Sequence, residues 1–311
     1  MAVDGPEPQC LPLEGAAMDA FLESTDSFLF DCDGVLWRGN RAIDGAPEAV
    51  NALRRRGKRV YFVTNNSRRT RDMYEQKLRR LGFDAGREQV FGSAFLAAQF
   101  LRQEASLPAN GKVFVIGDAA VCEELDEAGI SYVRPVPEPV FGDIEQWSSL
   151  PLEPDVCAVL VAFDQHFSYI KLTKACSYLA DPECLFLATN RDNAEMVAPG
   201  RVIPVTGSLL AAVETGAARQ AIVLGKPSPF ILRCIASVSP EGPLEPRRTA
   251  IVGDRLDTDI YFGQTCGLRS VLSLSGVSTL DEAFANRRAG HLDMVPQYYV
   301  QGVADFLRPD C

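Results

Sequence analysis

The sequence predicts an α/β protein built around a parallel sheet. From Ser27 onward, short apolar runs alternate with amphipathic helical patterns, which is typical of consecutive β-α-β units. Several of the apolar runs end directly in polar, glycine-containing motifs, as strands do at the carboxyl edge of an open parallel sheet. With 311 residues, of which 47% are hydrophobic, the chain is long enough for roughly two domains with apolar cores.

The composition argues against several classes of protein. Lys and Arg number 31 against 41 Asp and Glu, and a net charge of −10 does not suit a nucleic-acid scaffold, which needs clustered cations. No run approaches the ~18–20 apolar residues of a membrane span, and no basic segment followed by an apolar one opens the chain. The nine cysteines lack a C-x-x-C pair, which favours reduced thiols. We therefore expect a cytoplasmic protein without a nucleic-acid or membrane partner.

The elements follow in chain order. Residues 1–26 are expected to form a loose N-terminal arm with a short helical stretch at Gly15–Glu23. The proline-rich segment Arg134–Asp155 is expected to be an irregular surface excursion. The expected strands are Ser27–Phe30, Arg59–Val63, Val113–Ile116, Ala158–Ala162, Leu185–Ala188, Ala221–Leu224, Thr249–Val252 and Ser270–Leu274. The expected helices are Ala46–Arg56, Arg71–Leu81, Phe95–Glu104, Ala119–Ala128, Tyr169–Leu179, Leu209–Thr215 and Phe230–Ser237.

The first polar motif follows the strand Ser27–Phe30. Asp31 and Asp33 are two residues apart on an extended segment, so their side chains point the same way and share one space. Two such carboxylates repel each other unless a cation neutralises them, which implies a divalent metal ion. The alternative is a plain acidic turn, for which Asp and Gly are common residues.

Two further motifs supply hydrogen-bond donors and a cation. Thr64, Asn65 and Asn66 follow the strand Arg59–Val63, and their hydroxyl and amide groups can hold phosphoryl oxygens. The alternative is that they only cap the next helix. Lys226 follows the strand Ala221–Leu224 and can reach back as a fixed cation, or else be merely solvated.

A second pair of carboxylates follows the strand Thr249–Val252. Asp254 lies at the end of the strand and Asp259 about one helical turn later, a spacing that suits an oxygen-binding cation. Together with Asp257, these acids could instead be a charge cluster favoured at a helix N-terminus. Four polar motifs at strand ends, in this order, favour a single active site over four coincidences.

These motifs resemble those of the haloacid-dehalogenase-like phosphatases, which carry D-x-D-G, a Thr or Ser at a strand end, a Lys, and G-D-x-x-x-x-D in that order. Within this superfamily the stretches FDCDGVLWRGNRAIDGAPEAV, VTNNSRRTR, LVAFDQHFSYIKLTKA and VGDRLDTDI resemble animal phosphoglycolate (glycerol 3-phosphate) and pyridoxal phosphate phosphatases. The resemblance implies a Rossmann-like core at 27–107 and 219–311 and an inserted α/β cap at 108–218 that selects the substrate.

The resemblance also implies roles for the motif residues. Asp31 would be the nucleophile and Asp33 the general acid and base. Mg²⁺ would be held by the Asp31 carboxylate, the Asp33 backbone carbonyl and Asp254, with Asp259 nearby or acting through water. The groups expected to bind the phosphoryl group are those of Thr64, Asn65, Asn66 and Lys226.

The substrate would depend on the cap segment Thr189–Ser208. Pyridoxal phosphate phosphatases carry histidines in this loop, and this chain has none there, whereas its T-N-x-D-N sequence resembles the phosphoglycolate version. Asn190, Asp192 and Asn193 are therefore the candidate specificity residues. The expected substrate is a small phosphorylated metabolite, 2-phosphoglycolate or glycerol 3-phosphate, with pyridoxal 5′-phosphate, and even phosphoproteins, as the alternative. The resemblance further implies a homodimer formed through the cap.

Three points remain open at this stage. Cys32 lies between the two catalytic acids, where its oxidation could block the site, although flanking acids disfavour a thiolate. Trp37 lines the substrate entry or, as its size favours, packs in the core. A noncatalytic binding protein on the same fold is the remaining alternative, since fold alone does not establish activity.

Overall fold

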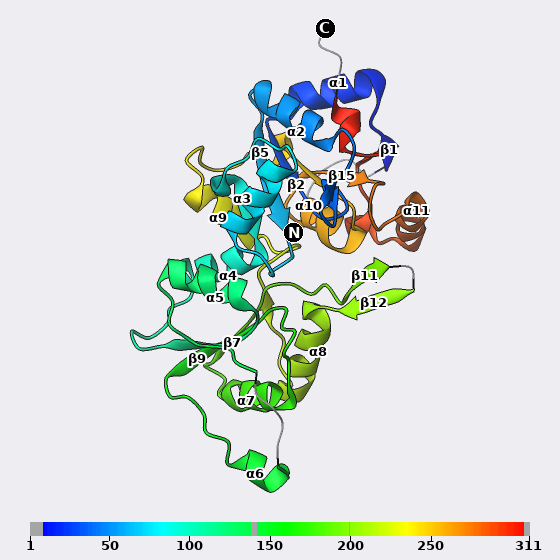
Figure 1. Ribbon diagram of the computed structural model, residues 1–311. Coiled ribbons are helices and arrows are strands. Elements are labelled where there is room, and N and C mark those ends of the chain that lie inside the picture. The colour runs from blue at the N-terminus through cyan, green and yellow to red at the C-terminus, as the bar shows by residue number, and fades with distance from the viewer. Residues whose placement is uncertain (1–8, 138–141, 199, 308–311) are drawn as a thin grey trace. The chain divides into compact units, whose positions relative to one another are not determined.

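The computed structural model describes residues 9–137, 142–198 and 200–307 (Figure 1). The chain divides into two compact units. The first comprises Met1–Thr64, Arg71–Phe91 and Lys226–Cys311, and the second comprises Asn65–Thr70 and Gly92–Gly225. In the described residues, no helix combines the length and apolar character that crossing a membrane requires.

The first unit is built on a seven-stranded sheet in the order β1-β16-β15-β14-β2-β5-β6. The strands are β1 (Leu11–Pro12), β2 (Ser27–Phe30), β5 (Arg59–Thr64), β6 (Val90–Gly92), β14 (Thr249–Gly253), β15 (Arg269–Ser273) and β16 (Tyr298–Val300). The inner strand β2 pairs in parallel with β5 on one side and β14 on the other. All four β2 residues are buried, because helices cover both faces of such a sheet and its strands are apolar throughout.

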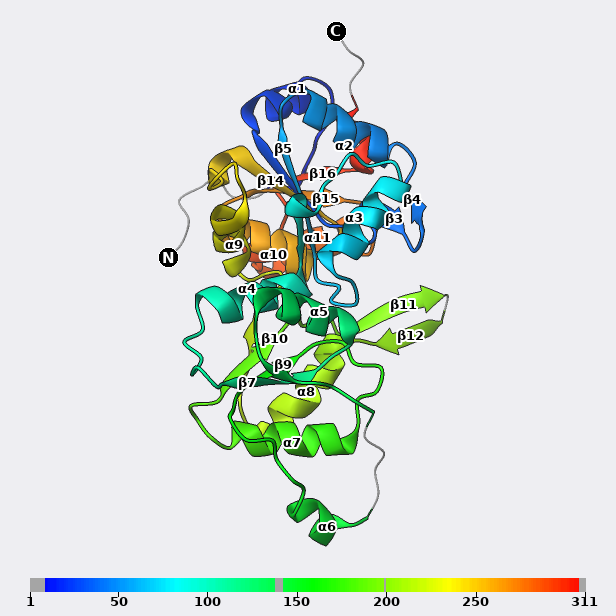
Figure 2. The same ribbon diagram turned by 60° about the vertical axis from the view of Figure 1, so that its left-hand side comes forward.

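Helices and a small hairpin complete this unit (Figure 2). The hairpin strands are β3 (Trp37–Arg38) and β4 (Arg41–Ala42). The α-helices are α1 (Gly15–Ser24), α2 (Ala46–Arg55), α3 (Arg71–Arg80), α9 (Phe230–Val238), α10 (Tyr261–Thr265) and α11 (Leu280–Ala289). A five-residue π-helix, Leu256–Ile260, follows β14, and π-helical turns are frequent at functional sites.

The described part of the N-terminal segment is an integral part of the core, which corrects the expectation of a loose arm. β1 pairs in parallel with β16, and α1 buries Met18, Phe21 and Leu22. The Phe21 ring contacts Phe28 of β2 at a centroid distance of 6.3 Å. Met18, Phe21 and Leu22 have the i, i+3, i+4 spacing of an apolar helix face, and this pattern anchors the segment.

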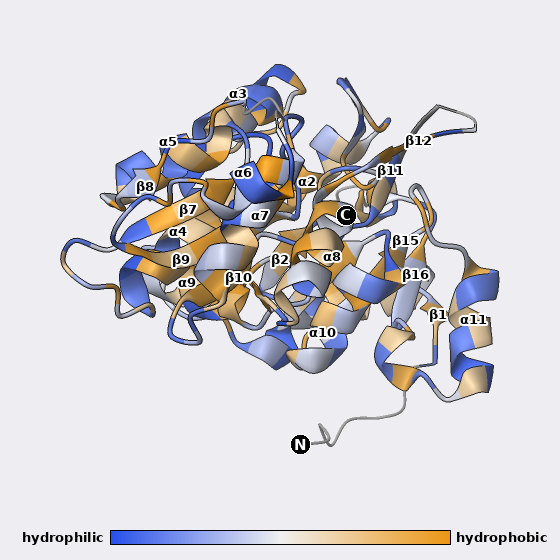
Figure 3. Ribbon diagram, turned by 90° about the horizontal axis from the view of Figure 1, so that it is seen from below, coloured by the Kyte–Doolittle hydropathy of each residue, from blue (hydrophilic) through white to orange (hydrophobic). Residues whose placement is uncertain are grey.

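The second unit is built on a five-stranded parallel sheet in the order β13-β10-β9-β7-β8. The strands are β7 (Lys112–Ile116), β8 (Tyr132–Val133), β9 (Val156–Val161), β10 (Leu185–Ala188) and β13 (Ile222–Val223). An antiparallel hairpin is formed by β11 (Ala194–Ala198) and β12 (Arg201–Pro204). β7, β9 and β10 carry apolar side chains, as the colouring in Figure 3 shows, and their buried residues form a core of this unit's own.

The helices of the second unit are α4 (Ser93–Gln103), α5 (Ala119–Ala128), α6 (Ile144–Ser148), α7 (Tyr169–Leu179) and α8 (Thr206–Ala217). The unit extends beyond the cap predicted at 108–218, because α4 packs against α5 and β13 pairs with β10. α6 lies inside the segment expected to be irregular, in a stretch between two prolines where Asp143 caps the helix by accepting a hydrogen bond from the Gln146 N–H at 3.1 Å. Residues 138–141 of that segment lie outside the described residues.

Candidate active site

Three adjacent strands of the first unit end in predicted site residues. Asp31 follows β2, Thr64 ends β5, and Asp254 follows β14. Because β2 pairs in parallel with both neighbours, the three carboxyl ends meet at one edge of the sheet, where open α/β sheets place their ligands. The expected convergence of the first, second and fourth motifs within this unit is therefore explained by the strand order.

Three carboxylates gather at this edge. Asp31, Asp254 and Asp259 are buried, and each offers an oxygen within 4.8 Å of the others'. Hard carboxylate oxygens are the ligands that Mg²⁺ prefers, so the donor set fits that ion. All three belong to the residues expected from the sequence to hold or support a metal ion, and the Asp33 backbone carbonyl, the fourth of them, stays a prediction. Asp257 lies outside it, since its carboxylate is paired with the Arg255 guanidinium at 2.9 Å on the surface.

Lys226 supplies the cation of the cluster. Its side chain is 2% exposed, and its Nζ donates hydrogen bonds to Asp31 Oδ1, to Asp259 Oδ1 at 2.7 Å and to the Val63 carbonyl at 3.1 Å. Burial by itself lowers the pKa of the ammonium, but Asp259 and Asp31 outweigh it, and the pKa of Lys226 is raised. The lysine is thus held charged, which contradicts the reading of a merely solvated side chain.

Burial also changes the acids. It raises the pKa of Asp31 well above the ordinary value, with further increases from Asp259 and Asp254 and an opposing effect of Lys226. Burial and the neighbouring Asp259 raise the pKa of Asp254 to about 7, against the lowering effect of the Val277 N–H. These shifts describe the protein without a metal ion. A divalent cation would favour the ionised carboxylates, since opposite charge lowers a carboxyl pKa.

The backbone around the acids is shaped to fit them. Asp254 Oδ2 accepts the Val277 N–H at 2.9 Å, and Asp259 Oδ2 accepts the Arg255 N–H at 3.1 Å. A Cβ at Gly34 would collide with the Asp254 carboxylate, and Gly34 has a φ of +90°. The glycine of the first motif is therefore needed both for its turn and for the close approach of an acid.

The Asp33 carboxylate contacts two side chains that were not predicted from the sequence to be its partners. The Trp37 indole N–H donates a hydrogen bond to Asp33 Oδ1 at 2.7 Å, and the Lys77 ammonium lies 3.9 Å from the same oxygen. Trp37 is fully buried, so the packing alternative is correct and the substrate-entry alternative is wrong. The sequence analysis did not identify Lys77 as a site residue. Lys77 lies with Tyr74 and Leu78 on the buried face of α3, and a lysine among the apolar positions of an amphipathic helix could have indicated a buried charged partner.

The remaining polar candidates belong to the second unit. The Asn65 side chain donates a hydrogen bond to Asp192 Oδ1 at 3.3 Å, and its carbonyl accepts one from the Asn190 amide at 2.7 Å. The side-chain oxygen of Asn66, Oδ1, accepts a hydrogen bond from the Arg68 backbone N–H at 3.0 Å. Asn193 is exposed, and its backbone carbonyl accepts the Ser208 hydroxyl at 2.7 Å. Asn190 and Asp192, two of the three predicted specificity residues, thus form hydrogen bonds with Asn65, the residue that follows Thr64.

Cys32 is buried between the two acids. Burial raises the pKa of its thiol well above the usual value, and Asp31 and Asp33 raise it further. The thiolate is the form that oxidants attack, so this environment protects the sulfur.

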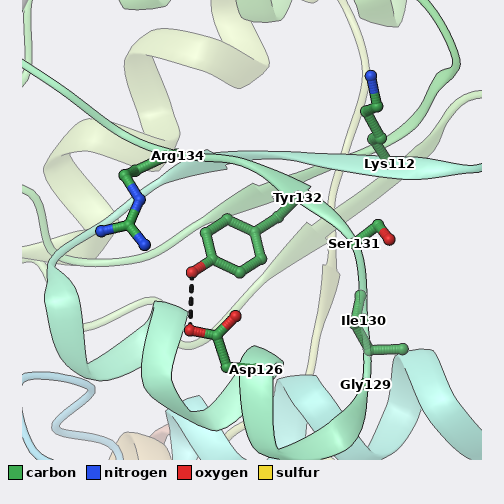
Figure 4. Close-up of a pocket in the computed structure, with 7 residues that line it drawn as sticks. All are labelled: Lys112, Asp126, Gly129, Ile130, Ser131, Tyr132 and Arg134. Carbon is green, nitrogen blue, oxygen red and sulfur yellow. Dashed lines mark hydrogen bonds between the residues drawn. The ribbon is translucent and has the colours of Figure 1, made fainter.

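A separate pocket of about 510 Å³ lies in the second unit. In it the Tyr132 hydroxyl donates a hydrogen bond to Asp126 at 3.0 Å (Figure 4). Its other lining residues are Lys112, Gly129, Ile130, Ser131 and Arg134. None of the predicted site residues lines it, so we assign it no role in the chemistry.

Comparisons with known proteins agree with this geometry. A family model described as haloacid dehalogenase-like hydrolase matches residues 28–131, and a HAD-hydrolase-like model matches residues 223–305. Among solved structures, glycerol phosphate phosphatase from Mycobacterium tuberculosis in complex with magnesium has a TM-score of 0.74 at 27% identity, covering 92% of this chain and 78% of that chain. NagD from E. coli has a TM-score of 0.73 at 27% identity, covering 90% and 97%.

Curated relatives align over nearly the full length. Glycerol-3-phosphate phosphatase of mouse (Mus musculus) is 48% identical in an alignment that covers 97% of this chain and 96% of that protein. Human (Homo sapiens) chronophin is 48% identical over 300 residues, which is 96% of this chain and 97% of that protein. The buried carboxylates, the fold and these similarities agree, and the chain belongs to the haloacid dehalogenase-like hydrolases.

Proposed function

We propose that this chain is a Mg²⁺-dependent phosphatase that hydrolyses small phosphomonoesters through an aspartyl-phosphate. The observation that carries the proposal is the buried cluster of Asp31, Asp254 and Asp259 around Lys226. Burying three acids with one base leaves an excess of negative charge, which is costly unless a divalent cation offsets it. The bound cation can in turn attract an anionic phosphate group. The magnesium in the mycobacterial relative supports the same choice of ion.

The proposed chemistry divides among the residues of the first unit. Asp31 attacks phosphorus, and Asp33 protonates the departing alkoxide and later takes a proton from the attacking water. Asp31, the Asp33 backbone carbonyl and Asp254 would hold Mg²⁺, with Asp259 supporting the site. When bound, the ion offsets repulsion between the nucleophile and the phosphate. Lys226 keeps Asp31 oriented and, with Thr64, stabilises charge on the transferring phosphoryl group.

The second unit is proposed to select the substrate. Asn65 and Asn66 would bind phosphoryl oxygens, and Asn190 and Asp192 would hold Asn65 in place through the hydrogen bonds described above. Asn193 is the exposed member of the group and is the candidate for direct contact with the substrate. The proposed homodimer through this unit and the cytoplasmic location remain predictions.

The proposed substrates are 2-phosphoglycolate and glycerol 3-phosphate. The support comes from the absence of histidine in Thr189–Ser208 and from relatives named glycerol-3-phosphate phosphatase at 48–50% identity. Pyridoxal 5′-phosphate is the second candidate. It is favoured by the sequence stretches that resemble pyridoxal phosphate phosphatases, the group to which we assign the relatives named chronophin, which are 46–48% identical to this chain.

The deciding experiment compares phosphate release from 2-phosphoglycolate, glycerol 3-phosphate and pyridoxal 5′-phosphate, with Mg²⁺ and with EDTA. Asp31→Asn serves as the blank, because it removes the nucleophile while keeping the size of the side chain. We expect release that needs both Mg²⁺ and Asp31, and faster release from the aliphatic phosphates. Preference for pyridoxal phosphate would overturn the substrate but leave the mechanism. Release from none of them would contradict the proposed function.

A further inference from the structure

The chain returns on itself directly after the catalytic motif. The Cys32 carbonyl accepts the N–H groups of Leu36 and Trp37 at 2.9 and 3.2 Å, and the Gly34 N–H donates to the Trp37 carbonyl at 2.8 Å. Gly34 takes the left-handed φ that this tight turn requires. The turn brings the Trp37 side chain beside Asp33, four residues earlier in the chain. The first motif therefore supplies not only its two acids but also a neighbour for one of them.

Two side chains hold one oxygen of Asp33. Trp37 Nε1 donates to Oδ1 at 2.7 Å, and Lys77 Nζ lies 3.9 Å from that same atom. Lys77 Nζ also lies 4.1 Å from the centroid of the Trp37 ring, which is a cation–π contact. All three residues belong to the first unit. The contacts form a closed triangle in which each member touches the other two.

The three residues of this triangle differ in their exposure to solvent. The Lys77 side chain is 5% exposed and Trp37 is 0% exposed, whereas the Asp33 side chain is 47% exposed. A buried ammonium costs free energy that an apolar residue at the same place in α3 would not, and an ion pair rarely recovers more than this cost. A role in packing alone would be met by Leu or Met at 77 and by Phe at 37. What Lys77 and Trp37 add is a fixed partner for a carboxylate that is otherwise open to solvent.

We propose that Trp37 and Lys77 are positioning residues that fix the general acid Asp33. Both contacts are made to Oδ1, which assigns Oδ2 to proton transfer. In the step concerned, an Asp31 oxygen forms a bond to phosphorus and the bond from phosphorus to the leaving oxygen breaks. The electron pair stays on the leaving oxygen, which takes the proton from Asp33 Oδ2. This inference rests on the proposed function and adds two residues to it.

The test uses the leaving group as its readout. An alkoxide such as that of glycerol 3-phosphate needs a proton to depart, whereas 4-nitrophenolate leaves without one. The variants are Trp37→Phe, which keeps a ring but loses the N–H, and Lys77→Met, which keeps the length but loses the charge. Measured as kcat/KM, which covers the chemistry up to departure of the leaving group, the glycerol 3-phosphate reaction should fall about 10-fold or more. The 4-nitrophenyl phosphate reaction should change by less than about 2-fold, because it does not draw on Asp33.

Controls separate positioning from structural damage. Asp33→Asn should show the same selectivity for the leaving group, with a larger loss. Lys171→Met removes another buried lysine, one whose ammonium is 2.5 Å from Asp164 in the second unit, and should lower stability without leaving-group selectivity. If Lys77→Met does not fold, as circular dichroism would show, Trp37→Phe decides alone. An equal loss with both substrates overturns the positioning role while leaving the proposed function standing. If the unmodified protein releases no more phosphate than Asp31→Asn does, the proposed function is overturned instead.

Discussion

Lys226 is the residue on which the electrostatics of the site depends. It is a buried cation that faces two buried carboxylates, Asp31 and Asp259, and it also donates to the Val63 carbonyl. Removing one partner from such a cluster costs more than the net value of the pair, because the remaining charges stay buried without compensation. The same side chain orients the nucleophile. Stability and activity therefore depend on one atom, Nζ.

Replacing Lys226 by Met is expected to lower kcat/KM for phosphate release by about 100-fold or more, as removal of a charge-stabilising donor does. A matched control is Lys58→Met, since Lys58 donates to the Leu22 and Thr25 carbonyls at 2.7 and 2.6 Å, away from the site residues. That variant should lose stability and keep its activity. Steady-state kinetics on both variants, with thermal unfolding alongside, checks the prediction. A Lys226→Met enzyme with more than half of the original activity would contradict it.

Cys32 illustrates how a residue between two functional acids can be chemically quiet. Because burial and the adjacent carboxylates raise its thiol pKa, we expect Cys32→Ser to leave the rate of inactivation by hydrogen peroxide unchanged. The measurement is loss of phosphatase activity with time in wild type, Cys32→Ser and Cys176→Ser, the last being a partly buried cysteine in the second unit. Resistance seen in Cys32→Ser alone would restore the redox role that the sequence suggested.

Among the elements, the strands with a continuous apolar run were predictable, including the two-residue edge strand β13, whereas other short strands were not. All eight expected strands are present, with β2 and β10 at the expected bounds, because apolar residues that face helices on both sides leave a continuous pattern. β1, β8 and β16 have two or three residues each and lie at or near sheet edges. Their existence depends on pairing with a neighbour, which no local pattern records.

The candidate site likewise contains residues that were predictable from the sequence and residues that were not. Asp31, Asp254 and Asp259 come together because each follows a strand or its first turn, which sequence order and strand pairing determine. Lys77 reaches Asp33 only because α3 packs against the turn at Trp37, a tertiary contact without a sequence motif. The boundaries of the second unit were misplaced because no Pro- or Gly-rich linker marks them. α4 follows β6 without interruption.

Helix α8 and the loop before the hairpin are joined by Glu214. Its carboxylate accepts hydrogen bonds from Arg191 Nη1 at 2.9 Å, from Arg191 Nη2 at 2.5 Å and from the Ala221 N–H at 2.9 Å. Burial alone raises the pKa of Glu214, but the bonds from Arg191 and Ala221 outweigh it, so the pKa is lowered. A carboxyl group with a lowered folded-state pKa stabilises the protein above its unfolded pKa and loses this effect as the pH falls.

Glu214→Gln is therefore expected to reduce the free energy of unfolding by about 1 kcal/mol at neutral pH, a modest value because Arg191 is 45% exposed and water screens the pair. The difference from wild type should shrink as the pH falls below the ordinary value of 4.5, because the Glu214 carboxyl of the unfolded chain takes up a proton there while that of the folded protein is still ionised. Urea unfolding of both proteins at neutral pH and at about pH 3.5 measures it. A difference that grows on acidification would show that Glu214 is not held as the anion.

At the scale of the whole molecule, stability should be linked to pH and metal together. The pKa of Asp254 is about 7 without metal, against an ordinary value of 3.8. Between these values the folded chain keeps a proton that the unfolded chain releases, so this group's stabilising effect is complete below about pH 4 and is lost as the pH rises through 7. Mg²⁺ acts in the opposite direction, because it binds the ionised carboxylates and competes with the proton.

With EDTA, the melting temperature should thus fall as the pH is raised from 6 to about 8, and saturating Mg²⁺ should raise it by about 5 °C or more at the higher pH and by less at the lower. Asp254→Asn is the matched control, since it removes the titrating group and a metal ligand at similar size. All other ionisable groups are common to both proteins, so the difference between them isolates Asp254. A Mg²⁺ effect equal at both pH values, or retained in Asp254→Asn, would place the ion elsewhere than among the buried carboxylates.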